Sequence, residues 1–201
     1  MSNTILLLKK MKTFELKGQS RAELGKKATK AVRVEKSVPC VLYGGNENTH
    51  FTTTISDLQK LVYSPEVFLV KLNIDGKKHD AIMKDLQFHP VTDKVLHIDF
   101  LEVFAEKPVV VEIPVQVEGL AAGVKAGGKL SLEMRKLRVK GIYTQIPEKI
   151  TLDVSALELG KSIQVGGVQV PNLEILNAKN AVVVQVKLTR AARGAAANAE
   201  K

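Results

Sequence analysis

The chain has 201 residues, a formal net charge of +9 and a pI near 9.6. That length allows one large or two small domains, and an apolar content of 45% is ordinary for a chain that buries a core. With Cys40 as the only cysteine, an internal disulfide and a cysteine-rich zinc site are excluded. The basic balance favours an acidic partner such as RNA, DNA or an anionic membrane.

The N-terminus is predicted to be a disordered extension over residues 1–10. Its apolar run, Ile5–Leu8, is shorter than the roughly seven residues of a signal-peptide core. No stretch reaches the roughly 18 apolar residues of a membrane helix, so no membrane partner is expected. Met11 is a natural alternative start.

Positive charge is concentrated in residues 9–36, which carry ten Lys and Arg against three Glu. This is the electrostatic footprint of a protein that binds a polyanion. The pattern predicts a strand over 12–17, a loop over 18–27 and a short helix over 28–35. The expected inward side chains of this helix are Ala28, Ala31 and Val32.

The same helix carries Lys26, Lys30 and Arg33 at helical spacing, on one outward stripe. Such a stripe fits a phosphate-binding surface, and it also fits an ordinary solvated helix face.

The next elements complete a first domain over 11–105. Alternation and turn residues predict strands over 38–43, 50–55, 67–74, 79–84 and 94–103. Ser56–Gln59 has the form of a capping box, so a helix with Leu58, Leu61 and Val62 inward should follow and end before Pro65. Cys40 lies in an apolar strand and is predicted to be a buried structural thiol, as in a reducing cytoplasm.

The segment 94–103 contains His97-Ile98-Asp99-Phe100. Alternation along a strand puts His97 and Asp99 on one face and the two apolar side chains on the other. A histidine beside a carboxylate is often a purely structural hydrogen-bonded pair, so this interpretation stands beside a functional one.

A second β-rich domain is predicted over 106–188, followed by a flexible tail over 189–201. Its expected strands are 109–117, 130–140, 150–154, 163–165, 173–176 and 181–188. Ser155–Glu158 is a second capping box and predicts one helical turn. The fold class is therefore mainly β with short helices.

Catalytic and cofactor motifs are missing. Gly123–Lys129 resembles a phosphate-binding loop, but Leu130 stands where the magnesium-ligating Ser or Thr would be. A strand pattern follows where a helix is needed, so a mobile glycine loop is the better interpretation. The four histidines lack metal-site spacing. We expect no enzyme, resident metal, cofactor or small-molecule substrate.

Four stretches together resemble the family of bacterial large-subunit ribosomal protein number twenty-five, which binds 5S rRNA. They are Arg21–Lys30 (RAELGKKATK), Val38–Gly44 (VPCVLYG), Gln87–Pro90 (QFHP) and His97–Phe100 (HIDF). The motifs cover about residues 12–104. Residues 105–188 match in overall pattern only, as in the long Ctc or general stress protein type with an added β domain.

The resemblance implies a six- or seven-stranded β-barrel like the anticodon-binding barrel of glutaminyl-tRNA synthetase. It implies that this barrel binds the loop E region of 5S rRNA, an irregular helix with bound magnesium. The contacts carried over from the family are Arg21, Lys26, Thr29, Lys30, Arg33, Tyr43, Gly44, Gln87, His89, His97 and Asp99.

The chemistry of these residues suits that target. Tyr43 offers a ring and a hydroxyl, and Gly44 has no side chain to keep the backbone from its ligand. Asp99 either accepts from a base amino group or orients His97 so that the imidazole donates outward; we favour the second role. The C-terminal domain would contact other components of the subunit. The alternative function is a stress-linked, ribosome-associated adaptor that acts through that domain.

Overall fold

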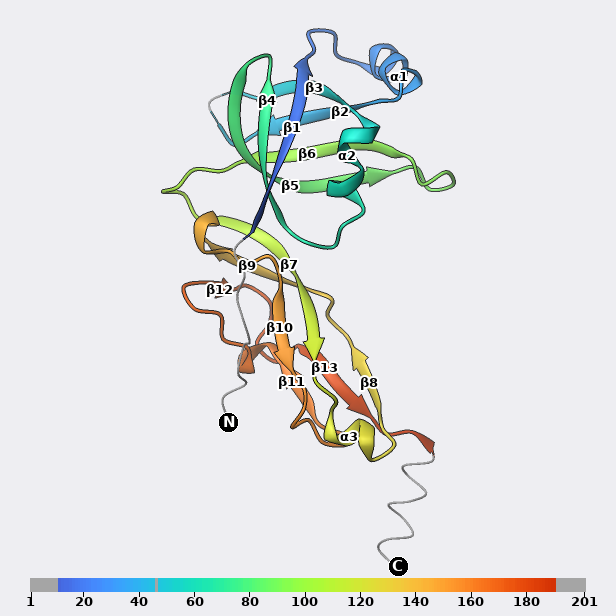
Figure 1. Cartoon of the computed structure of the whole chain (residues 1–201), viewed down its shortest axis with the longest axis vertical. Helices are drawn as coiled ribbons and strands as arrows, with labels where there is room; N and C mark the ends of the chain where they lie inside the picture. The colour runs from blue at the N-terminus through green and yellow to red at the C-terminus, as the bar shows by residue number, and fades with distance from the viewer. Residues whose placement is uncertain (1–10, 46, 191–201) are drawn as a thin grey trace, which may run out of the picture. The chain divides into compact units, whose positions relative to one another are not determined.

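The structure is a computed structural model that describes residues 11–45 and 47–190, and it divides into two compact units (Figure 1). The barrel unit comprises residues 11–109 together with 142–146, and the C-terminal unit comprises 110–141 and 147–190. The predicted extension over 1–10 and all but Thr189 and Arg190 of the predicted tail lie outside the described residues.

The barrel unit is a closed six-stranded barrel in the order β1-β3-β2-β6-β5-β4. Its strands are β1 (Lys12–Ser20), β2 (Ser37–Tyr43), β3 (Thr49–Thr54), β4 (Phe68–Ile74), β5 (Lys77–Phe88) and β6 (Val95–Glu102). β1 runs parallel to β4 and closes the barrel, and β2 runs parallel to β6. The predicted barrel is confirmed.

The barrel core is aliphatic with a small aromatic centre. Alternate residues of each strand point inward, so Leu16, Cys40 and Ile98 are almost fully buried. The rings of Phe51 and Phe100 meet at a centroid distance of 5.7 Å. Because the inward positions hold this core, the intervening residues of β2, β5 and β6 form an outer face.

The first strand is longer than its sequence pattern predicts. Residues 18–20 were expected in a loop, but Gln19 and Ser20 pair with Thr52 and Phe51 of β3. Gly18 lets β1 approach β3 closely, because a Cβ at this position would lie 2.5 Å from a ring carbon of Phe51. The bare backbone thus packs on that ring.

Two helices flank the barrel. α2 (Ile55–Val62) buries Leu58 and Leu61, and its N-cap is Thr54, whose hydroxyl accepts a hydrogen bond from the Asp57 amide at 3.4 Å. The prediction that the capping box begins at Ser56 was therefore wrong by two residues.

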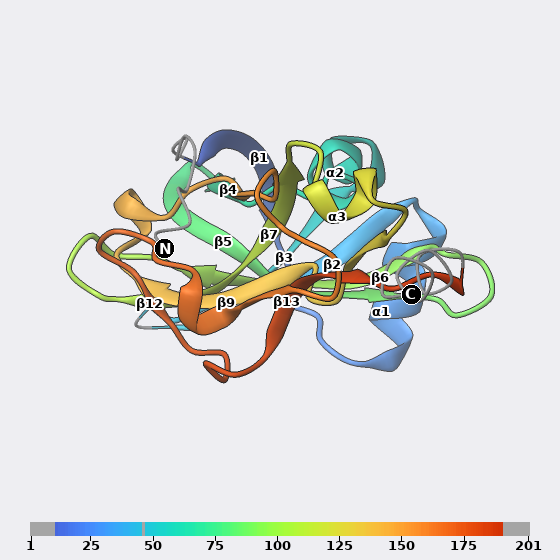
Figure 2. The ribbon, with the colours of Figure 1, turned by 90° about the horizontal axis from the view of Figure 1, so that it is seen from below.

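α1 (Lys26–Val34) stands at the edge of the barrel (Figures 1 and 2) and contains no buried residue. Ala28 and Val32 are half-buried as expected, but Ala31 is exposed. Because α1 has so little apolar contact, hydrogen bonds hold it in position, as described below.

The C-terminal unit is built from two small sheets, β10-β7-β9-β12 and β11-β13-β8. Its strands are β7 (Val109–Glu118), β8 (Lys129–Leu132), β9 (Lys136–Gly141), β10 (Ile150–Asp153), β11 (Ser162–Gln164), β12 (Glu174–Ile175) and β13 (Val182–Lys187). The single strand predicted over 130–140 is two strands, because the chain leaves one sheet at Glu133 and enters the other at Lys136.

Two local predictions in this unit were wrong. Ser155–Glu158 forms a turn instead of a helix, because Asp153 accepts hydrogen bonds from the Ser155 amide and hydroxyl at 2.8 and 2.6 Å. The glycine-rich loop is a packed corner around α3 (Ala122–Lys125), where a Cβ on Gly123 would lie 2.5 Å from the Leu159 nitrogen. A 3₁₀ turn, η2 (Val165–Gly167), completes this unit, and a second one, η1 (Tyr143–Gln145), belongs to the barrel unit.

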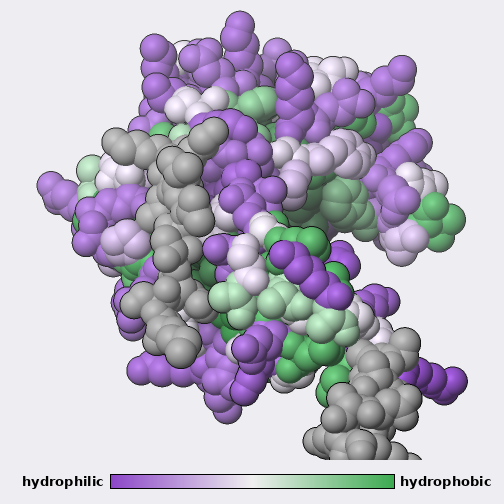
Figure 3. All heavy atoms as spheres, turned by 60° about the horizontal axis from the view of Figure 1, so that its bottom comes forward, coloured by the Kyte–Doolittle hydropathy of each residue, from purple (hydrophilic) through white to green (hydrophobic). Residues whose placement is uncertain are grey.

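Hydrophilic side chains cover most of the face that Figure 3 shows. No helix in the described parts of the chain is long and apolar enough to cross a membrane. Within those parts, no group of three or more potential ligand residues could hold a metal ion.

Candidate nucleic-acid interface

The loop that precedes α1 is ordered by Arg21 and Thr29. Nη2 of Arg21 donates to the Thr29 hydroxyl at 3.2 Å, and its Nε donates to the Glu23 carbonyl at the same distance. The Thr29 hydroxyl donates in turn to the Gly25 carbonyl at 2.7 Å. These two predicted contact residues therefore shape the loop, and only part of their hydrogen-bonding capacity is left for a ligand.

The helix presents its cations differently. Lys26 and Lys30 are exposed, and neither lies within ion-pair distance of a carboxylate in residues 11–45 and 47–190. Arg33 donates from Nε and Nη2 to the Leu96 carbonyl of β6, at 3.1 and 2.9 Å. Arg33 thus joins the basic stripe of α1 to the strand that carries His97.

The outer face of β2, β6 and β5 brings the remaining polar residues together. His97 and Asp99 lie on the same side of β6, and Gln87 of β5 pairs directly with His97. Tyr43 is on the outer side of β2, whose Val41 pairs with Asp99. Residues far apart in the sequence therefore lie on one outer face, where the apolar Val41 and Leu101 stand among the polar side chains.

The His97–Asp99 pair is formed as predicted. Nδ1 of His97 lies 2.7 Å from Oδ1 of Asp99, and the two side chains are 27% and 30% exposed. Because a carboxylate only accepts, the imidazole donates from Nδ1, and a neutral ring is left with Nε2 as an acceptor. A neutral ring therefore presents an acceptor outward, whereas the outward donor that we expected from His97 requires a protonated ring.

A second carboxylate, Asp85, belongs to this surface and was missed in the sequence. It pairs directly with Asp99 across β5 and β6. It was missed because the strand was predicted to end at residue 84, whereas β5 continues to Phe88 and keeps Asp85 in regular alternation with Gln87. Two like charges in this position repel each other and favour a donor between them.

The charges of both carboxylates act on the hydroxyl of Tyr43. Burial, and then the charges of Asp99 and Asp85, raise the pKa of its hydroxyl above the ordinary value. The hydroxyl therefore keeps its proton at neutral pH and is available as a hydrogen-bond donor.

Gly44 and His89 have clear architectural roles. Gly44 has a φ of 101°, and a Cβ there would lie 2.7 Å from Cδ1 of Leu101, so the close approach it permits is to β6. Nδ1 of His89 accepts from the amides of Val91 and Thr92, both at 3.3 Å. The ring thus fixes the β5–β6 turn and carries its proton on Nε2 when neutral.

The surface has two chemical zones. The α1 zone consists of Lys26 and Lys30, and it is cationic because both lysines are free of ion pairs in the described residues. The strand zone combines two carboxylates, an amide, a phenol and an imidazole, which belong to Asp85, Asp99, Gln87, Tyr43 and His97. Cations suit phosphates, and the mixed zone suits base edges and ribose hydroxyls.

Comparison with known proteins identifies the family of the chain. Residues 16–100 match the ribosomal L25p family. The chain belongs to that family. Residues 108–190 match a second description, the C-terminal domain of ribosomal protein TL5.

Curated relatives carry the name large ribosomal subunit protein bL25. The one from Porphyromonas gingivalis is 60% identical over 188 residues, which is 92% of this chain and 98% of the relative. Those from Bacteroides fragilis and Phocaeicola vulgatus are 57% and 55% identical, over 95% of this chain and the full length of each relative. Family membership identifies a ribosomal protein of the bacterial cytoplasm and not an enzyme.

Proposed function

We propose that this protein is a structural constituent of the large ribosomal subunit and that its barrel unit binds 5S rRNA in the loop E region. The family match and the named relatives support the first part. The observation that carries the second is the double hydrogen bond from Arg33 to Leu96, which fixes the cationic zone beside the His97–Asp99 pair.

The two zones divide the work of recognition. Lys26 and Lys30 neutralise phosphates and release counterions, which supplies affinity that depends on salt. Asp85 and Asp99 repel phosphates, so the strand zone accepts hydrogen bonds from base amino groups and 2′-hydroxyls instead. A regular A-form helix hides its base edges in a narrow major groove, whereas an irregular helix exposes them.

Magnesium enters only with the RNA in this proposal. The described residues hold no cluster for a metal ion. Cations that sit on loop E would lower the repulsion between RNA phosphates and the two carboxylates.

The decisive experiment measures binding of the full chain to 5S rRNA and to a regular RNA duplex across a salt series. For wild type we expect tighter binding to 5S rRNA and a logarithmic affinity that falls linearly with the logarithm of salt concentration. His97→Ala should lose about tenfold on 5S rRNA and little on the duplex, because only the irregular helix engages the strand zone.

The matched control is His79→Ala. Nδ1 of His79 lies 2.7 Å from Oε1 of Glu102, so it forms the same kind of pair in the same barrel. It lines a separate hollow of about 520 Å³ with Ser20 and Phe104. Equal losses for both variants, or equal losses of His97→Ala on both RNAs, would contradict recognition by the strand zone.

A further inference from the structure

The C-terminal unit has a cationic ridge of its own on β9. The sequence Lys136-Leu137-Arg138-Val139-Lys140 alternates strictly, with Leu137 and Val139 fully buried. The three cations Lys136, Arg138 and Lys140 are exposed on the opposite side. The core therefore dictates that these three charges point the same way. We call them the β9 ridge.

The ridge charges are not neutralised by ion pairs. In the described residues, no carboxylate lies within ion-pair distance of Lys136, Arg138 or Lys140. Glu174 of β12 pairs in register with Lys140, and Glu112 is exposed on the neighbouring strand β7. Glu174 therefore offsets part of the positive charge at the Lys140 end of the ridge.

The ridge is also held rigidly. The backbone amide of Arg138 donates to Oδ1 of Asn177 at 2.7 Å, and its carbonyl accepts from the Leu176 amide at 2.9 Å. On the other side, the Val115 amide donates to the Arg135 carbonyl at 2.9 Å. Little backbone ordering is left to oppose binding at this strand.

We propose that the β9 ridge is a second RNA-contacting surface, which binds the phosphate backbone of an RNA helix without regard to its sequence. Neighbouring ridge side chains are two residues apart on a strand, about 6.6 Å, and this repeat suits a ligand with regularly spaced charges. The outer face of β9 has no apolar residue to enter a lipid bilayer. The surface is separate from the barrel zones and does not depend on them.

The test uses the full chain and a regular RNA duplex without loop E as the probe. The triple variant Lys136→Gln, Arg138→Gln, Lys140→Gln should bind about tenfold more weakly at low salt. Its salt slope should fall by about two, because each neutralised phosphate contributes about 0.9 and Glu174 weakens the share of Lys140.

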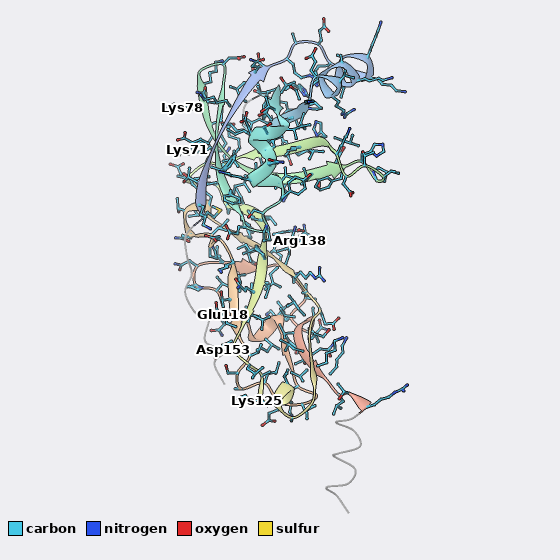
Figure 4. The ribbon with its side chains drawn as sticks, turned by 45° about the vertical axis from the view of Figure 1, so that its right-hand side comes forward. Lys71, Lys78, Glu118, Lys125, Arg138 and Asp153 are labelled. Atoms are coloured by element: carbon cyan, nitrogen blue, oxygen red, sulfur yellow. The ribbon has the colours of Figure 1, made fainter. Side chains whose placement is uncertain are left out.

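The control removes three charges elsewhere in the same unit, by Lys125→Gln, Lys161→Gln and Lys179→Gln. All three are exposed, and Lys125 lies on α3, at the far end of the unit from Arg138 (Figure 4). Equal losses of duplex affinity in the two triple variants, at unchanged unfolding midpoints, would overturn the proposal, because net charge alone would then explain binding. An unchanged slope for the ridge variant would overturn it as well.

The outcome is separable from that of the barrel site. His97→Ala is read on 5S rRNA against the duplex, whereas the ridge variant is read on the duplex against its charge-matched control. A ridge variant with a reduced slope supports the ridge even where His97→Ala has no effect.

Discussion

Arg33 and Leu96 link the two zones of the barrel surface. The guanidinium donates twice to one carbonyl, at 3.1 and 2.9 Å, and the next residue of β6 is His97. Because α1 has no buried residue of its own, these two hydrogen bonds hold the helix against the barrel in place of apolar packing.

Replacing Arg33 with Lys should separate the effect of the positive charge at this position from the effect of the hydrogen bonds that position α1. The ammonium keeps the charge but has no planar fork to make two bonds at fixed geometry. We expect Arg33→Lys to weaken 5S rRNA binding severalfold with little change in salt slope, and to speed amide exchange in α1. Lys30→Gln should do the reverse, lowering the slope by about one without loosening the helix. Wild-type exchange and affinity in Arg33→Lys would show that the contact is dispensable.

The protonation of His97 gives a prediction that needs no RNA. If Asp99 accepts from Nδ1, the neutral ring has its proton on Nδ1 and a bare Nε2. Nitrogen NMR of the free protein at pH 8 should therefore show a protonated Nδ1 for His97 and a protonated Nε2 for His89, whose Nδ1 accepts from two amides. The same tautomer at both histidines would contradict the hydrogen-bond assignment.

Asp99→Asn tests what that tautomer is for. An amide of the same shape removes the charge and offers Nδ1 a donor as well as an acceptor, so the ring is no longer fixed. We expect the preference for 5S rRNA over a regular duplex to fall about tenfold, measured as the ratio of the two Kd values. A preserved ratio would mean that the imidazole does not read the RNA.

The His97–Asp99 pair was predictable because it depends on one rule, the alternation of a regular strand. Asp85 was not, because the sequence pattern predicted this strand only to residue 84, whereas β5 runs on to Phe88. Ser155 shows a similar limit: it fits a capping pattern, but the carboxylate of Asp153 two residues before it captures its amide and hydroxyl. Local patterns fail where a neighbour in space competes for the same group.

The basic segment shows a different limit. Its charge count predicted a polyanion-binding region, but it did not predict that Arg21, Thr29 and Arg33 form hydrogen bonds within the protein. These partners are up to 63 residues apart in sequence, and no spacing rule connects them. The β9 ridge alternates in the sequence as plainly as the His97 strand, yet it becomes a surface only once Leu137 and Val139 are seen to be buried.

Cys40 should not react with thiol reagents in the native protein. It is 1% exposed, and burial is the main cause that raises the pKa of its thiol far above the ordinary value. Since the thiolate is the reactive form, a thiol reagent should modify the chain only after denaturant unfolds the barrel. Cys40→Ser should lower the free energy of unfolding by about 1–3 kcal/mol, because it buries a hydroxyl among apolar side chains. Rapid labelling of the folded chain would show that the barrel opens at β2.

The acid sensitivity of the C-terminal unit should depend on Glu133. Hydrogen bonds from Lys187, Gln185 and Ser131 lower the pKa of its carboxyl from 4.5 to about 2. Because the folded pKa is depressed, the stabilisation is fully present above the unfolded value of 4.5 and is lost as pH falls through 2. Glu133→Gln should therefore speed amide exchange in β13 at pH 7, with a difference from wild type that shrinks between pH 4.5 and pH 2. Glu118→Gln, an exposed carboxylate of β7 (Figure 4), is the control. A difference in exchange that stays constant over this range would show that the Glu133 charge does not stabilise the β8–β13 pair.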